Sequence, residues 1–126
     1  MGKKSKKRIE VFLNDQILIA YEDKKGIFKF DCVTGDKDHL TPIGSFLIYR
    51  KHEKYTSKKY KVRMDYAMFI YKGIAIHMAY MVAPMSYLKR FGIDCFGSHG
   101  CIRLSEDDAK SLFKWALMGT PVKVLK

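Results

Sequence analysis

A cysteine and a histidine lie two residues apart in the segment FGSHGCIRLSEDDAK, which runs from Phe96 to Lys110. In an extended segment, side chains two positions apart point to the same side, so His99 can lie beside the sulfur of Cys101. A cysteine reacts as its thiolate, and its ordinary pKa of about 8.5 leaves little thiolate at neutral pH. A neighbouring imidazole can accept the thiol proton, and both His99 and the more distant His77 are candidates for this base.

Gly100, between the histidine and the cysteine, permits a backbone conformation that suits such a site. Without a Cβ atom it can adopt a positive φ or let a substrate approach the main chain closely. The backbone N–H groups of Gly100 and Cys101 could then face a developing oxyanion, where loss of one donor costs about 3 kcal/mol in some enzymes. The segment therefore contains the components of a thiol nucleophile with oxyanion donors.

Two other interpretations of the same residues remain open. Cys95, His99 and Cys101 together with His77 would form a Cys2His2 ligand set, which zinc accepts. The spacing of the first three is not that of a zinc finger or knuckle, so we favour the nucleophile and expect no metal or other cofactor. Cys101 could also be a small buried residue after a glycine turn, and spacing alone does not separate this interpretation from a reactive thiol.

The elements that must position these residues are mainly β-strands. Alternating apolar residues bounded by turn formers predict strands at 8–13, 16–21, 26–33, 45–51 and 120–126, and the apolar stretch 66–80 predicts two more strands on either side of a central turn. Asn14 and Asp15 predict a two-residue hairpin turn, and the Tyr-Lys-Gly sequence at 71–73 predicts a second hairpin. In the first strand, Ile9, Val11 and Leu13 would share one face. We therefore expect a mainly β, α+β fold built as a compact β-sandwich.

Two helical segments are expected beside the strands. Ser105 followed by Asp108 resembles a capping box, and the acidic residues between them suit the positive end of a helix dipole. Apolar residues recur at helical spacing through 105–118, which predicts a helix that packs with one face; they are Ala109, Leu112, Phe113 and Ala116. Gly119 would end this C-terminal helix. A short helical insertion is predicted at 85–92.

Length and composition indicate one globular domain over residues 1–126, in which residues 1–7 are expected to form a basic, disordered tail. This tail lacks the apolar run of a signal peptide, so either the protein is cytosolic or a targeting segment has been removed. The longest apolar stretch, 73–85, is interrupted by His77 and is too short to cross a bilayer, so no transmembrane segment is expected.

The formal net charge of +11 suggests polyanionic partners. The segment 50–63 contains seven Lys or Arg residues and one Glu, with Tyr55 and Tyr60 between them. Such a mixture could bind nucleic acid through counterion release. No nucleic-acid-binding motif accompanies the charge, so we favour a solvated hairpin and expect no specific nucleic acid. An anionic cell-wall polymer is a further candidate partner.

The three cysteines, Cys32, Cys95 and Cys101, form an odd number. In an oxidising compartment one thiol must stay unpaired, whereas in the cytosol all three would be reduced. Cys32 ends a strand-like segment and is expected to be a small buried apolar residue. A Cys32–Cys95 disulfide is conceivable, but nothing in the spacing supports it.

The sequence SHGCIRL at 98–104 closely resembles the active-site signature of the L,D-transpeptidase catalytic domain, the YkuD family, in which Ser or Thr precedes His-Gly-Cys. Other segments resemble family motifs in the same order along the chain: TPIGSF at 41–46, MDYAMFI at 64–70, GIAIHM at 73–78, LSEDDAK at 104–110 and GTPVKV at 119–124. The resemblance covers nearly the whole chain after the first few residues. It implies the L,D-transpeptidase fold.

The resemblance implies a role for each residue that matches a motif. Cys101 would be the nucleophile and His77 the general base, with the backbone at Met78 orienting the imidazole in place of a carboxylate. His99 and Ser98 would shape the pocket, and His99 could also help to stabilise charge.

Three further residues have implied roles in the site. Gly100 would supply oxyanion donors together with the nucleophile. Arg103 would contact a substrate carboxylate or support the site from behind, with a surface salt bridge as the alternative. Tyr66 would line the cleft, with a core aromatic as the alternative.

Two departures from the family pattern concern the segment after the base. Met78 stands where the family often has glycine or another small residue. The interval from His77 to Ser98 is also longer than usual, and an inserted helix or loop there could reshape the acceptor side of the site.

The resemblance implies acyl transfer on peptidoglycan stem peptides. The Cys101 thiolate would attack the third residue of a tetrapeptide stem and expel the terminal D-alanine, and an amine would then resolve the thioester. Water as acceptor would make the protein an L,D-carboxypeptidase. Carbapenem-type inhibitors are expected ligands, and the expected location is the periplasm or the cell wall. A non-catalytic, basic polyanion-binding module is the remaining alternative.

Overall fold

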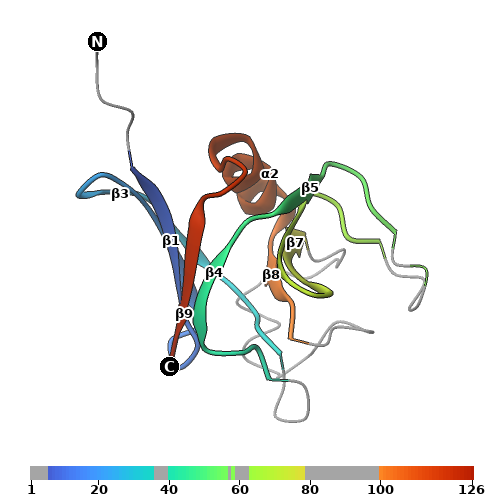
Figure 1. The fold of residues 1–126 in the computed structure, drawn as a ribbon, viewed down its shortest axis with the longest axis horizontal. Coiled ribbons are helices and arrows are strands. Elements are labelled where there is room, and N and C mark those ends of the chain that lie inside the picture. Colours follow the sequence, from blue (N-terminus) through green and yellow to red (C-terminus); the bar gives the residue numbers. More distant parts are fainter. Residues whose placement is uncertain (1–5, 36–39, 57, 59–62, 79–99) are drawn as a thin grey trace.

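The computed structural model describes residues 6–35, 40–56, 58, 63–78 and 100–126, which form two β-sheets and a helix (Figure 1). The elements are β1 (Lys7–Phe12), β2 (Ile17–Glu22), β3 (Lys25–Asp31), β4 (Gly44–Leu47), β5 (Arg50–His52), β6 (Ala67–Tyr71), β7 (Ile74–Met78), β8 (Ile102–Leu104), α2 (Glu106–Trp115) and β9 (Pro121–Leu125). The strand order is β3-β2-β1-β9-β4 in one sheet and β5-β6-β7-β8 in the other. The expected mainly β fold with a C-terminal helix is confirmed. The insertion expected at 85–92 lies outside the described residues.

The five-stranded sheet joins the two ends of the chain. β1 pairs antiparallel with β2 and parallel with β9, so the last strand lies beside the first (Figure 1). The side chains of Ile9 and Val11 are fully buried and Leu13 packs against them, as the alternating pattern predicts. One face of this sheet therefore covers the core.

Two expectations for the N-terminal region are corrected. The turn after β1 comprises residues 13–16 rather than two residues, and Gln16 within it has a φ of 54°. Its side-chain amide donates to the Leu13 carbonyl (2.8 Å), which closes the longer turn. Lys7, which was expected in the basic tail, instead begins β1, and its ammonium group donates to the Trp115 carbonyl (2.8 Å).

The segment 45–51, predicted as one strand, contributes to two strands in different sheets. β4 pairs with β9 in the first sheet, whereas β5 pairs with β6 in the second. Between them, the buried Ile48 donates its N–H to the Thr120 carbonyl (3.0 Å) and accepts from the Gly119 N–H (2.7 Å). The chain crosses from one layer to the other here, and a continuous apolar pattern does not reveal such a crossing.

The four-stranded sheet carries the segment that leads to His77. β6 and β7 form the hairpin predicted at 71–73. β8 pairs in parallel with β7, with His77 opposite Arg103. The chain that follows Gly100 is thereby placed beside the strand that ends with His77 and Met78.

α2 has the predicted N-cap, and a lysine side chain donates hydrogen bonds to carbonyls at its C-terminal end. The Ser105 hydroxyl accepts from the Asp108 N–H (3.4 Å), which confirms the capping prediction. At the other end, the Lys51 ammonium group donates to the carbonyls of Phe113 and Ala116 (2.6 Å each). The last carbonyls of a helix have no intrahelical partner, so this lysine from β5 ties the helix to the second sheet.

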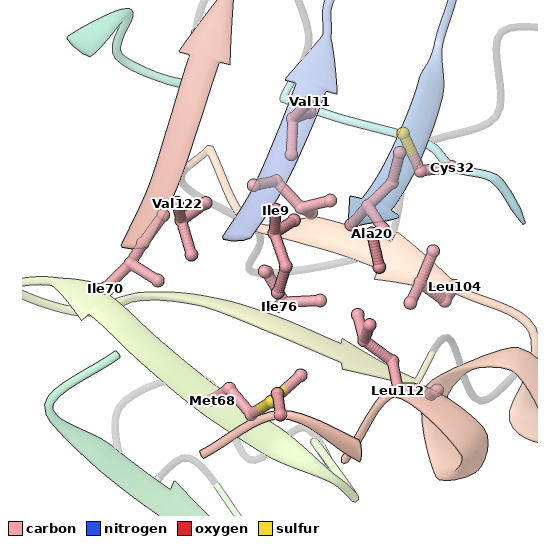
Figure 2. Packing of buried hydrophobic residues seen from close by; sticks show 14 of the residues in the cluster. Ile9, Val11, Ala20, Cys32, Met68, Ile70, Ile76, Leu104, Leu112 and Val122 are labelled. Carbon is pink, nitrogen blue, oxygen red and sulfur yellow. The ribbon is translucent and has the colours of Figure 1, made fainter. Parts of the chain in front are cut away.

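The main core lies between the two sheets and α2, where side chains from all three point toward one another (Figure 2). They include Ile9, Val11, Ala20 and Val122 from the first sheet, Met68, Ile70 and Ile76 from the second, and Leu112 from α2. Cys32 is fully buried in this cluster, as predicted for a small apolar residue, whereas Cys95 lies outside the described residues. No helix in the described part of the chain is long and apolar enough to span a membrane.

Candidate active site

Cys101 belongs to a second apolar cluster on the face of the four-stranded sheet that points away from the main core. Strand side chains alternate between faces, and Ile76 and Ile102 belong to the main core. The second cluster contains Met64, Ala67, Phe69, Ala75 and Cys101, with Tyr55 packed against it. His77 and Arg103 follow the same alternation, so their side chains share this second face with Cys101.

The pairing of β7 with β8 brings Cys101 and His77 together from distant parts of the chain. His77 pairs with Arg103, and Cys101 precedes Arg103 by two positions. Because side chains two positions apart share a face, Cys101 and His77 are diagonal neighbours on adjacent strands. The Cys101 thiol and the His77 imidazole therefore lie on the same face of the sheet.

The Cys101 side chain lies against the start of β7. The residue is 4% exposed, the Ala75 N–H donates to its sulfur (3.4 Å), and the thiol donates to the Gly73 carbonyl (3.8 Å). A sulfur accepts hydrogen bonds both as thiol and as thiolate, so the Ala75 N–H can remain its donor after deprotonation. These contacts hold the thiol in one orientation.

The His77 imidazole is buried and held by the backbone next to it. The residue is 4% exposed, and Nδ1 lies 2.7 Å from the Met78 carbonyl oxygen. A carbonyl can only accept, so Nδ1 carries the proton and Nε2 carries the lone pair. Burial lowers the pKa of His77 to about 4, the Met78 hydrogen bond opposes this change, and the Arg103 charge adds to it. The imidazole is therefore neutral at pH 7 and able to accept a proton.

Arg103 is fully buried, with 0% of its surface exposed. Its guanidinium group donates to the Thr34 carbonyl (3.2 Å), and its backbone N–H and C=O pair with those of Val33 (2.9 and 3.0 Å). The surface position considered for Arg103 is therefore wrong, because none of the residue is exposed. Its charge instead lies opposite His77 in the sheet.

A set of hydrogen bonds connects Arg103 to the turn after β1. The Gln16 side-chain oxygen accepts from the Thr34 N–H (3.0 Å), and the Gln16 amide donates to the Thr34 hydroxyl (2.7 Å). Thr34 in turn accepts from Arg103. The turn between β1 and β2, in the first sheet, thus supports β8 in the second.

Tyr66 lies on the helix side of the second sheet. Its ring packs against the Phe113 ring of α2, with centroids 5.6 Å apart, and joins the main core cluster. Its N–H donates to the Glu53 carbonyl (2.8 Å), and its φ is 56°. This position corresponds to the core alternative for Tyr66 rather than to the face that carries Cys101.

Some of the predicted site residues lie outside the described residues. These are Ser98, His99 and Cys95, together with most of the segment after Met78. Within the described residues, no three His, Cys, Asp or Glu side chains gather as metal ligands. The pocket and metal interpretations that involve His99 therefore stay predictions.

Two residues near the site had no role assigned from sequence. Thr41 is 3% exposed, and its hydroxyl donates to the Gly100 carbonyl (2.6 Å). The TPIGSF motif was the available signal for Thr41, although it indicated a segment and not a contact. Gln16 has no signal in the sequence, because its side chain meets Thr34 only when β2 and β3 pair and bring the start of β2 beside the residues that follow β3.

Comparisons with known proteins agree with the fold. The family model described as the L,D-transpeptidase catalytic domain, YkuD, matches residues 6–124. A solved L,D-transpeptidase from Stackebrandtia nassauensis is 30% identical, with a TM-score of 0.83, over 100% of this chain and 58% of that chain. A cysteine-to-serine mutant of an Enterococcus faecium L,D-transpeptidase is also 30% identical, with a TM-score of 0.81, over 97% of this chain and 50% of that one.

A more distant structure shows the fold alone. L,D-transpeptidase 3 from Mycobacterium tuberculosis, solved with a faropenem-derived adduct, is 21% identical with a TM-score of 0.77, over 97% of this chain and 61% of that chain. No curated protein matches the chain. The chain spans 50–61% of the length of these three solved proteins. Because the family model covers nearly all of it, the chain belongs to the YkuD family of L,D-transpeptidase catalytic domains.

Proposed function

We propose that this domain is a cysteine-dependent L,D-transpeptidase that acts on the tetrapeptide stems of peptidoglycan. The observation that carries the proposal is the placement of Cys101 and His77 as diagonal neighbours on one face of paired strands. The Met78 carbonyl holds the imidazole in the tautomer that can accept a proton. Membership of the L,D-transpeptidase catalytic domain family supports the same reaction class.

The first half-reaction forms a thioester on Cys101. The thiol proton passes to Nε2 of His77 while Sγ attacks the carbonyl carbon of the third stem residue. The tetrahedral intermediate then collapses as the C–N bond to the terminal D-alanine breaks. The leaving amine takes the proton from His77, so that free D-alanine departs and the imidazole is neutral again.

The second half-reaction resolves the thioester. An amine of a second stem attacks the thioester carbon, its proton passes to His77, and the C–S bond breaks as the new amide forms. The sulfur leaves as thiolate and takes the proton from His77, which restores the resting pair. Attack by water would give the L,D-carboxypeptidase reaction through the same steps, so the acceptor alone separates these two activities.

The electrostatics of the buried base support a neutral resting pair. With the pKa of His77 lowered to about 4 by burial, the imidazole is unprotonated at neutral pH and does not form a standing ion pair with a thiolate. Proton transfer then accompanies attack on the substrate. A general base must be unprotonated at the working pH before it can accept a proton, and His77 meets this condition.

The other proposed roles follow the order of the motif. The N–H groups of Gly100 and Cys101 serve as oxyanion donors, and Ser98 and His99 shape the pocket. Arg103 supports β8 from behind through the Thr34 carbonyl, and its buried charge attracts the carboxylate of the stem.

The proposed partners and location follow from the substrate. Peptidoglycan stems lie outside the cytoplasmic membrane, so the periplasm or the cell wall is the proposed location. The net charge of +11 suits association with an anionic wall polymer, through attraction that salt weakens. Carbapenems are proposed as acylating inhibitors, since their strained carbonyl can react with the same thiol.

Intact-mass spectrometry after incubation with a tetrapeptide-stem donor or with imipenem tests the proposal. We expect one acyl adduct on wild-type protein, none on Cys101→Ala, and slow acylation of His77→Gln. Adding an amine acceptor to the peptide reaction should convert the acyl-enzyme to a cross-linked product. An unmodified wild type that remains folded would refute the enzyme proposal, and labelling of Cys101→Ala would refute the assigned nucleophile.

A basic, non-catalytic polyanion-binding module is the second candidate, favoured by the charge of the chain. It predicts salt-sensitive binding to an anionic polymer that survives Cys101→Ala, without any covalent adduct. The same mass measurement, combined with binding at two salt concentrations, separates the two functions.

A further inference from the structure

The Thr41 hydroxyl connects two loops behind the Cys101 backbone. It donates to the Gly100 carbonyl (2.6 Å) and accepts from the Gly35 N–H (3.0 Å). Thr41 is 3% exposed, so these hydrogen bonds are shielded from water. A buried hydroxyl with both a donor and an acceptor partner has a fixed orientation, and it fixes the groups that it contacts.

Gly100 is pressed against the same segment. Its φ is +91°, and a Cβ atom placed on it would lie 2.9 Å from the Leu40 carbonyl oxygen and 3.3 Å from the Cα of Thr41. The main chain at 40–41 therefore packs directly against Gly100. The hydrogen bond from the Thr41 hydroxyl determines the direction of the Gly100 carbonyl.

The direction of that carbonyl determines the direction of the next amide. The described peptide bonds include none in cis, and in a planar trans peptide the C=O and the following N–H point in opposite directions. Since the Gly100 carbonyl points at Thr41, the Cys101 N–H points away from Thr41. The nitrogen and Sγ of Cys101 are joined through Cα and Cβ alone, so an acyl group on Sγ holds its oxygen within reach of this N–H.

We propose that Thr41 is a positioning residue that aims the Cys101 N–H at the oxyanion formed during acyl transfer. The inference rests on the proposed function and assigns to it a side chain that touches neither substrate nor sulfur. Thr41 acts on the peptide that joins Gly100 to Cys101, whereas Thr34 and Arg103 fix β8 beyond it. Correct aim matters because an oxyanion donor works only when it is directed at the position that the oxyanion occupies.

Two reactions of the same thiol separate this role from general support of the site. Acylation by imipenem passes through an oxyanion, whereas alkylation by iodoacetamide is a direct displacement at carbon with no oxyanion. Both rates depend on thiol exposure and on His77. Only the acylation rate depends on the Cys101 N–H.

The test uses Thr41→Val, which keeps the shape of the side chain but lacks the hydroxyl, and Thr41→Ser, which keeps the hydroxyl. We expect Thr41→Val to be acylated about tenfold to a hundredfold more slowly than wild type. This reduction in rate is somewhat smaller than the reduction caused by loss of a whole oxyanion donor. Its alkylation rate should stay within about twofold of wild type, since no oxyanion forms. Thr41→Ser should restore most of the acylation rate. With the stem peptide as donor, kcat should fall more than KM changes.

Thr120→Val is the matched control for deleting a buried threonine hydroxyl. Thr120 is 4% exposed and its hydroxyl accepts from the Leu117 N–H (3.0 Å), in the turn between α2 and β9. It should lower the melting temperature without changing the ratio of acylation to alkylation.

Three outcomes would overturn the inference. In Thr41→Val, both reactions could slow equally, or the acylation rate could stay unchanged. In Thr120→Val, the ratio of acylation to alkylation could fall as far as it does in Thr41→Val. A wild-type protein that is alkylated but never acylated would refute the proposed function itself, and the inference with it.

Discussion

Replacing His77 by glutamine should remove a specific loss of stability at acid pH. The wild-type imidazole is buried and neutral, with its pKa lowered from 6.5 to about 4. Between these two pH values the unfolded chain binds a proton at His77 that the folded chain excludes. Folding stability therefore falls as the pH drops through this window and is fully present above pH 6.5. Glutamine has no proton to bind, so the variant lacks this contribution.

The size of the effect follows from the change in pKa. A fall from 6.5 to about 4 corresponds to about 3–4 kcal/mol at about 1.4 kcal/mol for each pH unit. Because the folded state begins to bind a proton near pH 4, about 2–3 kcal/mol should be lost between pH 7.5 and pH 4.5. Carboxyl groups also titrate in this range, but they do so in both proteins. The difference between wild type and variant isolates His77.

Urea unfolding at pH 7.5, 6.5, 5.5 and 4.5 measures the effect. The free energy of unfolding of wild type should decline by about 2–3 kcal/mol more than that of His77→Gln over this range. The nuclear magnetic resonance titration of the imidazole should give the folded pKa independently. Parallel pH profiles for the two proteins, or an imidazole that titrates near 6.5 in the folded state, would refute a neutral buried base at this position.

Three further predictions, the first with a control substitution, concern Gly100, the end of α2 and Arg103. Gly100→Ala would place a Cβ atom 2.9 Å from the Leu40 carbonyl oxygen on a residue with a positive φ. It should lower the free energy of unfolding, measured in urea, by at least about 2 kcal/mol. In the control Gly73→Ala the added Cβ meets nothing within 4 Å, so the cost should be far smaller. Lys51→Met removes two hydrogen bonds to carbonyls at the end of α2 and should cost about 1–3 kcal/mol in the same assay; an unchanged urea midpoint would contradict this capping role. Arg103→Met removes a charge that lowers the pKa of His77. The pKa of the imidazole, measured by nuclear magnetic resonance, should therefore be higher in the variant than in wild type. An unchanged pKa would show that the two groups do not interact.

Much of the fold was predictable because local patterns and tertiary contacts agree. Alternation in the first strand places Ile9 and Val11 in the core, and the Ser105 cap begins α2 where the sequence predicts it. The predictions failed where the tertiary structure overrides a local pattern. The segment 45–51 divides between two sheets, and Lys7 belongs to β1 because it pairs with Glu22 of β2.

The residue types of the candidate site and the order of the family motifs were present in the sequence by itself. They indicated Cys101 as the thiol and placed His77 ahead of the adjacent His99 as the base. Only the tertiary structure decided that β7 and β8 pair in parallel, which sets Cys101 and His77 on one face. It also decided the burial that makes His77 neutral, the inward position of Arg103 and the Thr41 contact behind Gly100. The physical reason is that burial and hydrogen-bond direction depend on segments distant in sequence, which spacing along one chain does not encode.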